Sequence, residues 1–169
     1  MQANAPTPVA EPVDLAELLP IERVQLDGDA SSKKRALELV SESMLQGVDG
    51  ISDEVRPSAI FDAFLTRERL GSTGLGHGVA IPHGRLTGNE QTLAAFVRLE
   101  AGVDFDASDQ KPVDLIFALL VPEHSTDAHL QILASLARRF SDVAFCESLR
   151  EAASAEQIQR LLIAGPDGG

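Results

Sequence analysis

The sequence lacks tryptophan and tyrosine, and it contains a single cysteine, Cys146, among 169 residues. One cysteine excludes an internal disulfide and any zinc site built from cysteines. Cys146 falls in an apolar helical pattern with Val143 and Leu149. We therefore interpret it as a core thiol rather than a nucleophile. Because seven phenylalanines are the only aromatic residues, we expect a mainly aliphatic core.

Positive charge is also scarce. The 14 lysines and arginines are outnumbered by 26 aspartates and glutamates, which gives a net charge of -12. This excess repels phosphate backbones and anionic membrane surfaces, so nucleic acid is not an expected ligand. No segment approaches the roughly 18 apolar residues of a membrane span, and the N-terminus does not have the layout of a signal peptide. We expect a cytoplasmic protein without membrane insertion.

The length predicts one folded domain with short irregular ends. Residues 1–12 hold three of the nine prolines and little that could pack, so they are predicted to be a disordered lead-in. The domain is expected to span residues 13–163. Residues 164–169, which end in GPDGG, are predicted to be a frayed tail.

Apolar spacing and capping residues predict helices and strands across this domain. The expected helices run from an N-cap at Ser31 or Ser32 through Met44, from Ser58 to Leu70 with Gly71 as a C′ glycine, from Ser125 or Thr126 to Phe140, from Val143 to Leu149, and from an N-cap at Ser154 to Leu162. The expected strands are Val79–Ile81, Leu93–Leu99 and Val113–Val121. The last of these is almost continuously apolar, as in a central strand covered on both faces. This order predicts an α/β or α+β sandwich.

Glycines concentrate in the segment GSTGLGHGVAIPHGR, from Gly71 to Arg85. A Walker phosphate loop would need Lys and a hydroxyl after its second glycine, but His77 and Gly78 stand there. A dinucleotide fingerprint would lead into a helix, whereas these glycines lead into the expected strand at Val79. Neither nucleotide motif is present. The segment could still serve a binding module that holds an anion without covalent chemistry.

The same segment presents His83 between Pro82 and Gly84, just after a short apolar strand. Proline ends a strand, so we expect His83 at a strand end near the surface, with Gly84 leaving room for another molecule's backbone. A neutral imidazole is a competent nucleophile toward a phosphoryl group. The oxygens of the product need donors, and the candidates are Arg67, Arg85 and His129.

His129 lies in the first turn of the helix expected after the central strand. It could orient His83 or bond a phosphoryl oxygen, or it could simply be a polar residue at a helix start. A metal site made from His124, His129 and Asp127 is the competing hypothesis, but the two histidines are five apart and do not share a helical face. We expect no metal and no cofactor.

Three segments resemble the enzyme IIA domains of the mannitol/fructose type in the bacterial phosphotransferase system, and among them the nitrogen-regulatory type. They are LTRERLGSTGLGHGVAIPHGR (65–85), PVDLIFALLVPE (112–123) and HLQIL, which begins at His129. With the helices between them, the resemblance covers about residues 13–162. It implies an α/β fold in which a mixed sheet is flanked by helices on both sides.

The resemblance also implies a phosphoryl carrier. His83 would accept a phosphoryl group from an HPr-like phosphocarrier protein of the nitrogen type, as a transient Nε2 phosphohistidine. Residue by residue, His129 matches the second active-site histidine of the family and Arg67 its arginine, and no cofactor or metal is implied. His77 departs from the pattern, because relatives more often have Asn or Asp there.

Two functional classes follow from this resemblance. One is a regulatory switch whose phosphorylation state controls protein partners, none of which the sequence names. The other is a sugar-specific enzyme IIA that passes its phosphoryl group to a IIB transporter component. The GSTG segment, and the lack of a joined carrier, IIB or membrane domain, favour the switch.

Overall fold

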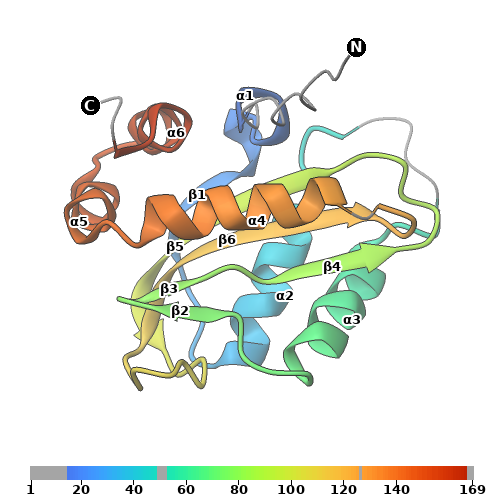
Figure 1. The fold of residues 1–169 in the computed structure, drawn as a ribbon, viewed down its shortest axis with the longest axis horizontal. Helices are drawn as coiled ribbons and strands as arrows, with labels where there is room; N and C mark the ends of the chain where they lie inside the picture. The colour runs from blue at the N-terminus through green and yellow to red at the C-terminus, as the bar shows by residue number, and fades with distance from the viewer. Residues whose placement is uncertain (1–14, 49–52, 126, 167–169) are drawn as a thin grey trace, which may run out of the picture.

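The computed structural model describes residues 15–48, 53–125 and 127–166, without the side chains of residues 127–129. The expected disordered lead-in, residues 1–12, lies outside this range. The elements, in order, are α1 (Leu15–Leu18), η1 (Ile21–Arg23), β1 (Val24–Gly28), α2 (Lys33–Ser43), α3 (Pro57–Glu68), β2 (Gly74–Gly76), β3 (Val79–Ala80), β4 (His83–Leu86), β5 (Leu93–Val103), β6 (Val113–Pro122), α4 (Asp127–Phe140), α5 (Val143–Glu151) and α6 (Ala155–Ala164) (Figure 1). Within these ranges no helix has the length and apolarity needed to cross a membrane.

One mixed sheet of six strands organises the molecule. Its order is β1-β5-β6-β3-β2, and β4 pairs with β6 beside β3. β6 is antiparallel to β5 and parallel to β3 and β4, and it is buried along almost its whole length. This confirms the predicted central strand. β3 and β4 therefore follow one another along a single edge of β6.

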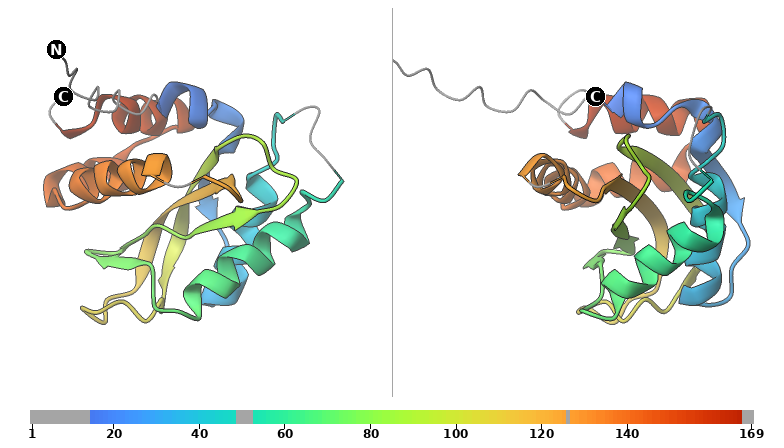
Figure 2. Two further views of the ribbon diagram at one scale, coloured as in Figure 1. Left: turned by 45° about the vertical axis from the view of Figure 1, so that its right-hand side comes forward. Right: turned by 90° about the vertical axis from the view of Figure 1, so that its right-hand side faces the viewer.

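Helices cover both faces of the sheet, as predicted (Figure 2). One core cluster joins the sheet to α1, α4, α5 and α6. A second cluster joins the opposite face to α2 and α3. Burial of apolar side chains on both faces is the main force that holds such a three-layer arrangement together.

Two of the expected helix starts are confirmed by their capping bonds. The hydroxyl of Ser32 accepts a hydrogen bond from the Arg35 amide at 3.1 Å, and Ser154 accepts one from the Gln157 amide at 3.1 Å. α6 continues to Ala164, one residue into the expected tail.

The end of α3 differs from the prediction. Its C-cap is Arg69, so Gly71 lies beyond the C′ position rather than at it. The cause is a tightened last turn, in which the amides of Leu70 and Gly71 donate to the carbonyls of Arg67 and Glu68.

β1 is not among the strands predicted from the sequence, because its last residues, Asp27 and Gly28, are typical of a turn. β1 is a five-residue edge strand that pairs in parallel with β5. β5 is also longer than expected, because it continues past Leu99 to Val103 through an irregular register. Short edge strands and irregular extensions carry little periodicity, so sequence patterns detect them poorly.

Cys146 is a core thiol, as predicted. It is fully buried in the cluster around α5, and its Sγ donates to the Phe140 carbonyl at 3.3 Å. Burial raises the pKa of the thiol, which disfavours the thiolate needed for nucleophilic chemistry.

Candidate functional site

The glycine-rich segment forms a tight hairpin between β2 and β3. His77 and Gly78, at its tip, both have positive φ, 58° and 81°, as in the type I′ turns that suit two-residue hairpins. The left-handed region is readily adopted by Gly and is enriched in Asn, Asp and His among other residues, so His77 fits this position. The His77 amide donates to the Asp109 carboxylate at 2.9 Å. The glycines thus shape a turn of the protein itself rather than a nucleotide loop.

His83 lies where the chain passes from β3 to β4. Pro82 interrupts the pairing with β6, yet its carbonyl accepts a hydrogen bond from the Leu119 amide at 2.9 Å. His83 then begins β4, opposite Leu119. The expected strand-end position is therefore the start of a second short strand, and the imidazole there is half-buried.

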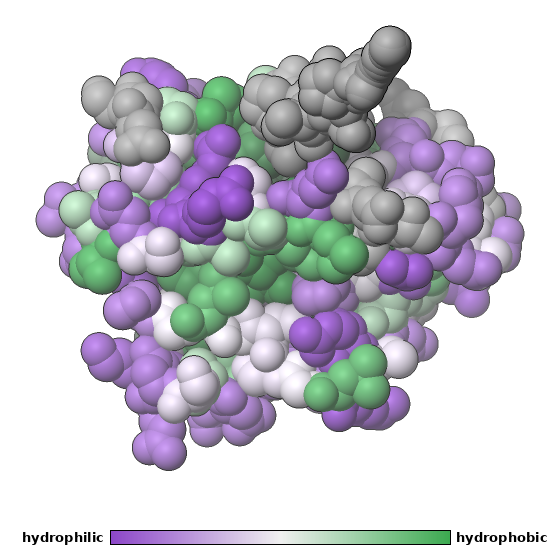
Figure 3. Space-filling model, in the orientation of Figure 1, coloured by the Kyte–Doolittle hydropathy of each residue, from purple (hydrophilic) through white to green (hydrophobic). Residues whose placement is uncertain are grey.

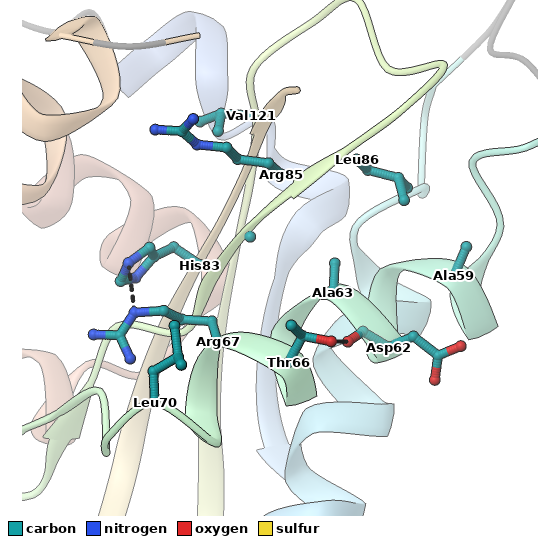
Figure 4. Close-up of a pocket in the computed structure, with 11 residues that line it drawn as sticks. Ala59, Asp62, Ala63, Thr66, Arg67, Leu70, His83, Arg85, Leu86 and Val121 are labelled. Atoms are coloured by element: carbon teal, nitrogen blue, oxygen red, sulfur yellow. Dashed lines mark hydrogen bonds between the residues drawn. The ribbon is translucent and has the colours of Figure 1, made fainter. Parts of the chain in front are cut away.

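Both ring nitrogens of His83 have identified partners. Nδ1 lies 3.0 Å from the carbonyl oxygen of Ile81, and Nε2 lies 3.2 Å from the Nε of Arg67 (Figure 4). A carbonyl can only accept and a guanidinium can only donate, so the proton is on Nδ1 and the lone pair is on Nε2. This is the tautomer in which Nε2 is able to act as a nucleophile.

Arg67 reaches His83 from the last turn of α3. Its Nη1 donates to the carbonyl of Gly71 at 2.8 Å while its Nε donates to the histidine. The guanidinium is therefore held between the loop after α3 and the start of β4. It places a permanent positive charge directly beside Nε2.

Gly84 has a packing role that the sequence did not predict. It is buried, and a Cβ added to it would lie 3.0 Å from the Cβ of Ala63 and 3.2 Å from the carbonyl carbon of that residue. The missing side chain lets α3 approach β4, and room for another molecule's backbone at Gly84 stays a prediction. This close approach brings Arg67 within reach of His83.

A cleft of about 660 Å³ opens beside the two residues, between α3 and β4. Its lining is mostly apolar and comprises Ala59, Asp62, Ala63, Thr66, Arg67, Leu70, His83, Gly84, Arg85, Leu86 and Val121. Leu70 is 82% exposed. Apolar side chains also gather on the surface between α4 and the strands next to it (Figure 3). The site therefore combines an apolar surface with an imidazole that carries its lone pair on Nε2 and an adjacent cation.

The structure brings two of the three predicted site residues together, His83 and Arg67. Arg85 projects from the same side of β4 as His83 and lines the same cleft (Figure 4). His129 belongs to the first turn of α4, but its side chain lies outside the described residues, so its role stays a prediction. The alternative metal site rests on the side chains of Asp127 and His129, which lie outside them too.

Sequence reasoning missed one charged residue that is buried next to the site, Glu68. It is the last residue of α3, where a carboxylate is disfavoured by the helix macrodipole. The sequence did offer one signal for this residue: an acidic side chain at a helix C-terminus needs a positively charged or hydrogen-bonding partner.

The chain matches the protein family described as "Phosphoenolpyruvate-dependent sugar phosphotransferase system, EIIA 2" over residues 17–164. It is 44% identical over 153 residues to the nitrogen regulatory protein of Klebsiella oxytoca, an alignment that covers 89% of this chain and 90% of the relative. It is 36% identical over 149 residues to the fructose-specific EIIA component of Haloferax volcanii, covering 88% and 94%. The crystal structure of nitrogen regulatory protein IIA-Ntr from Neisseria meningitidis is 43% identical, with a TM-score of 0.80 and coverage of 88% and 98%.

Proposed function

Because the chain belongs to the EIIA 2 family of the phosphoenolpyruvate-dependent sugar phosphotransferase system, we propose that His83 is its phosphoryl acceptor. The family resemblance predicted from the sequence is confirmed. As a phosphotransferase component, the protein takes a phosphoryl group from an HPr-like carrier and passes it on. Its similarity to nitrogen regulatory proteins gives it a nitrogen-regulatory role.

The observation that carries the proposal is the Nε2 lone pair of His83, set by the hydrogen bond from Nδ1 to Ile81. In transfer, this lone pair attacks phosphorus and forms the new N–P bond. The N–P bond of the donor's phosphohistidine breaks, and its electron pair returns to the donor nitrogen. The Ile81 carbonyl holds the ring in place and stabilises the positive charge that the imidazole acquires.

Arg67 supplies the charge stabilisation. Its hydrogen bond to Nε2 must be released as the phosphoryl group arrives, and its N–H groups then donate to the phosphoryl oxygens. Catalysis in such a transfer is mainly positioning and electrostatic stabilisation, because the reacting groups need little other covalent assistance. We propose that His129 provides a second donor from α4.

Phosphorylation would act as a switch through local charge. A phosphohistidine at His83 would add about -1.5 to -2 at the rim of the apolar cleft, by analogy with other phosphorylated side chains. That charge would weaken contact with an apolar or acidic partner. For the donor, we propose an HPr-like carrier of the nitrogen type with a basic face, because complementary fields speed the encounter with a protein of net charge -12.

The test is incubation with enzyme I, a nitrogen-type HPr-like carrier and phosphoenolpyruvate, followed by intact mass measurement. The wild-type chain should gain one phosphoryl group, and His83→Ala should gain none. His77→Asn is the matched control, because it removes an exposed histidine at a left-handed position that Asn tolerates. A phosphoryl group that persists on His83→Ala would contradict the assignment.

The likeness to the fructose-specific component of Haloferax volcanii supports a second candidate, transfer to a sugar-specific IIB component. Expression in a strain that lacks its fructose-specific or mannitol-specific enzyme IIA separates the two. The regulatory role predicts no recovery of sugar uptake. Recovery that depends on His83 would favour the sugar-specific role.

A further inference from the structure

Glu68 is a buried carboxylate close to the proposed acceptor. Its side chain is 3% exposed, and it ends α3, where the helix macrodipole disfavours negative charge. A charge so placed destabilises the fold unless partners compensate it. The segments that carry those partners are therefore held against the end of α3.

The Glu68 carboxylate is bonded by three donor groups from two residues on other segments. The Nζ of Lys33, at the start of α2, lies 2.8 Å away. The amide of Thr73 donates to it at 3.2 Å, and the hydroxyl of the same threonine donates as well. Thr73 is itself buried. The carboxylate thus fastens the end of the loop at residues 69–73 to α2 and α3.

Thr73 connects this anchor to the acceptor histidine. Its carbonyl accepts a hydrogen bond from the Ile81 amide at 3.0 Å. The carbonyl of Ile81 lies 3.0 Å from the Nδ1 of His83. Ile81 therefore bonds Thr73 through its amide and His83 through its carbonyl, so a shift of Thr73 would move the group that fixes the histidine tautomer.

The same loop also holds Arg67. The carbonyl of Gly71, which accepts from Arg67 at 2.8 Å, lies between the end of α3 and Thr73. Both ends of this short loop are fixed, one by the helix and the other by the bonds between Thr73 and Glu68. The Gly71 amide also bonds the Glu68 carbonyl, and the Ser72 hydroxyl bonds the Phe105 carbonyl. Releasing the second end would therefore shift the carbonyl that orients the guanidinium rather than free it.

We propose that Glu68 is a positioning residue for phosphoryl transfer, an inference that rests on the proposed function of His83. Through Thr73 it sets the Ile81 carbonyl that holds Nδ1 and the Gly71 carbonyl that holds Arg67. It touches neither reacting atom. A displacement of about 1 Å at a reacting group can lower a rate by about 10²-fold, so the effect is measurable.

Glu68→Gln tests this with little change of shape. It removes the charge that attracts Lys33 and replaces one acceptor oxygen by a donor. We expect the maximal rate of transfer from a phosphorylated HPr-like carrier to fall about 10-fold to 100-fold, with KM changing less than about twofold. Glu147→Gln is the charge-matched control, because Glu147 is paired with Arg150 on α5, and it should stay within about twofold of wild type.

Two further measurements distinguish positioning from simple stabilisation. Nitrogen-15 NMR of His83 should show the Nδ1–H tautomer in the wild type and in Glu147→Gln, and a mixture of tautomers in Glu68→Gln. Thr73→Val, which lacks the hydroxyl, should slow transfer, whereas Thr73→Ser, which keeps it, should restore most of the rate. The comparison of Thr73→Val with Thr73→Ser tests the proposal if Glu68→Gln does not fold.

The proposal is overturned if folded Glu68→Gln transfers at the wild-type rate, if its loss lies wholly in KM, or if its His83 tautomer is unchanged. Equal rates for Thr73→Val and Thr73→Ser also overturn it. Failure of the wild-type chain to become phosphorylated contradicts the proposed function instead. The tautomer comparison needs no phosphoryl donor, so it still tests the positioning in that case.

Discussion

The Nε of Arg67 lies 3.2 Å from the Nε2 of His83, so the arginine donates to the nitrogen that carries the lone pair. In the proposed function, this bond occupies the nitrogen that attacks phosphorus. The proposed transfer therefore requires the guanidinium to exchange the imidazole nitrogen for phosphoryl oxygens as its acceptors. This hydrogen bond holds the guanidinium beside the imidazole, and Arg67 supplies the positive charge of the site.

Arg67→Lys should reduce the rate of phosphoryl transfer, although it keeps the positive charge. Lysine carries all its N–H donors on one nitrogen, so it cannot reproduce the separate bonds that Nε makes to His83 and Nη1 makes to the Gly71 carbonyl. Loss of one well-placed donor of this kind typically lowers a rate by about 10²-fold to 10³-fold. Rapid-quench measurement of phosphoprotein formation gives the rate. A wild-type rate in Arg67→Lys would mean that charge alone is sufficient.

Gly84→Ala should destabilise the protein by about 1–3 kcal/mol, because the added methyl group overpacks the contact between β4 and α3. The urea dependence of unfolding measures this. Adding Ala63→Gly removes the closest contact, at 3.0 Å, but leaves the backbone contact at 3.2 Å. The double variant should therefore recover only part of the loss. An unchanged unfolding midpoint in Gly84→Ala would show that α3 can move away freely.

Asp109 should make stability depend on pH in the acid range. Its pKa is lowered because the amides of His77 and Lys111 donate hydrogen bonds to the ionised carboxylate. The stabilisation is fully present above the unfolded pKa of about 3.9, and it is lost as the pH falls through the lower folded value. Asp109→Asn should thus be less stable than wild type at pH 6, with the difference shrinking below about pH 4. A difference that is constant down to pH 2.5 would contradict this.

Cys146 should resist alkylation in the folded protein. Its side chain is fully buried, and burial raises the pKa of the thiol, so little thiolate forms near pH 8 and reagent cannot reach it. Iodoacetamide should modify the chain in denaturing urea but not in buffer, as measured by intact mass. Rapid modification in buffer would show that the cluster around α5 opens locally.

The sequence was sufficient for the parts of the molecule that have strong local signals. The apolar run of β6 and the serine caps at Ser32 and Ser154 depend only on residues that are close in the sequence. Such local signals predict helices and strands well. Gly84 shows the opposite case. Nothing in the sequence around this glycine indicates that it packs against Ala63, because the contact depends on how α3 lies against β4.

In the candidate site too, the sequence predicted individual residues but not the contacts between them. His83 and Arg67 stand in recognisable segments, so the sequence predicted both as candidates, but their direct contact depends on how α3 packs against β4. The contribution of Glu68 depends on Lys33, 35 positions earlier, and on the fold of the loop that carries Thr73. Such a network has no periodicity or spacing from which it could be predicted.

The pairing of β4 with β6 fixes the backbone on which His83 stands. β6 is buried and paired on both sides, so amides that bond to it should exchange with solvent only when the whole domain unfolds. Arg67 contacts the imidazole through the end of a long side chain, so its guanidinium can change acceptor while the end of α3 and the loop after it stay in place. The backbone of the site thus stays rigid during the proposed transfer, and the movement is confined to one cationic side chain.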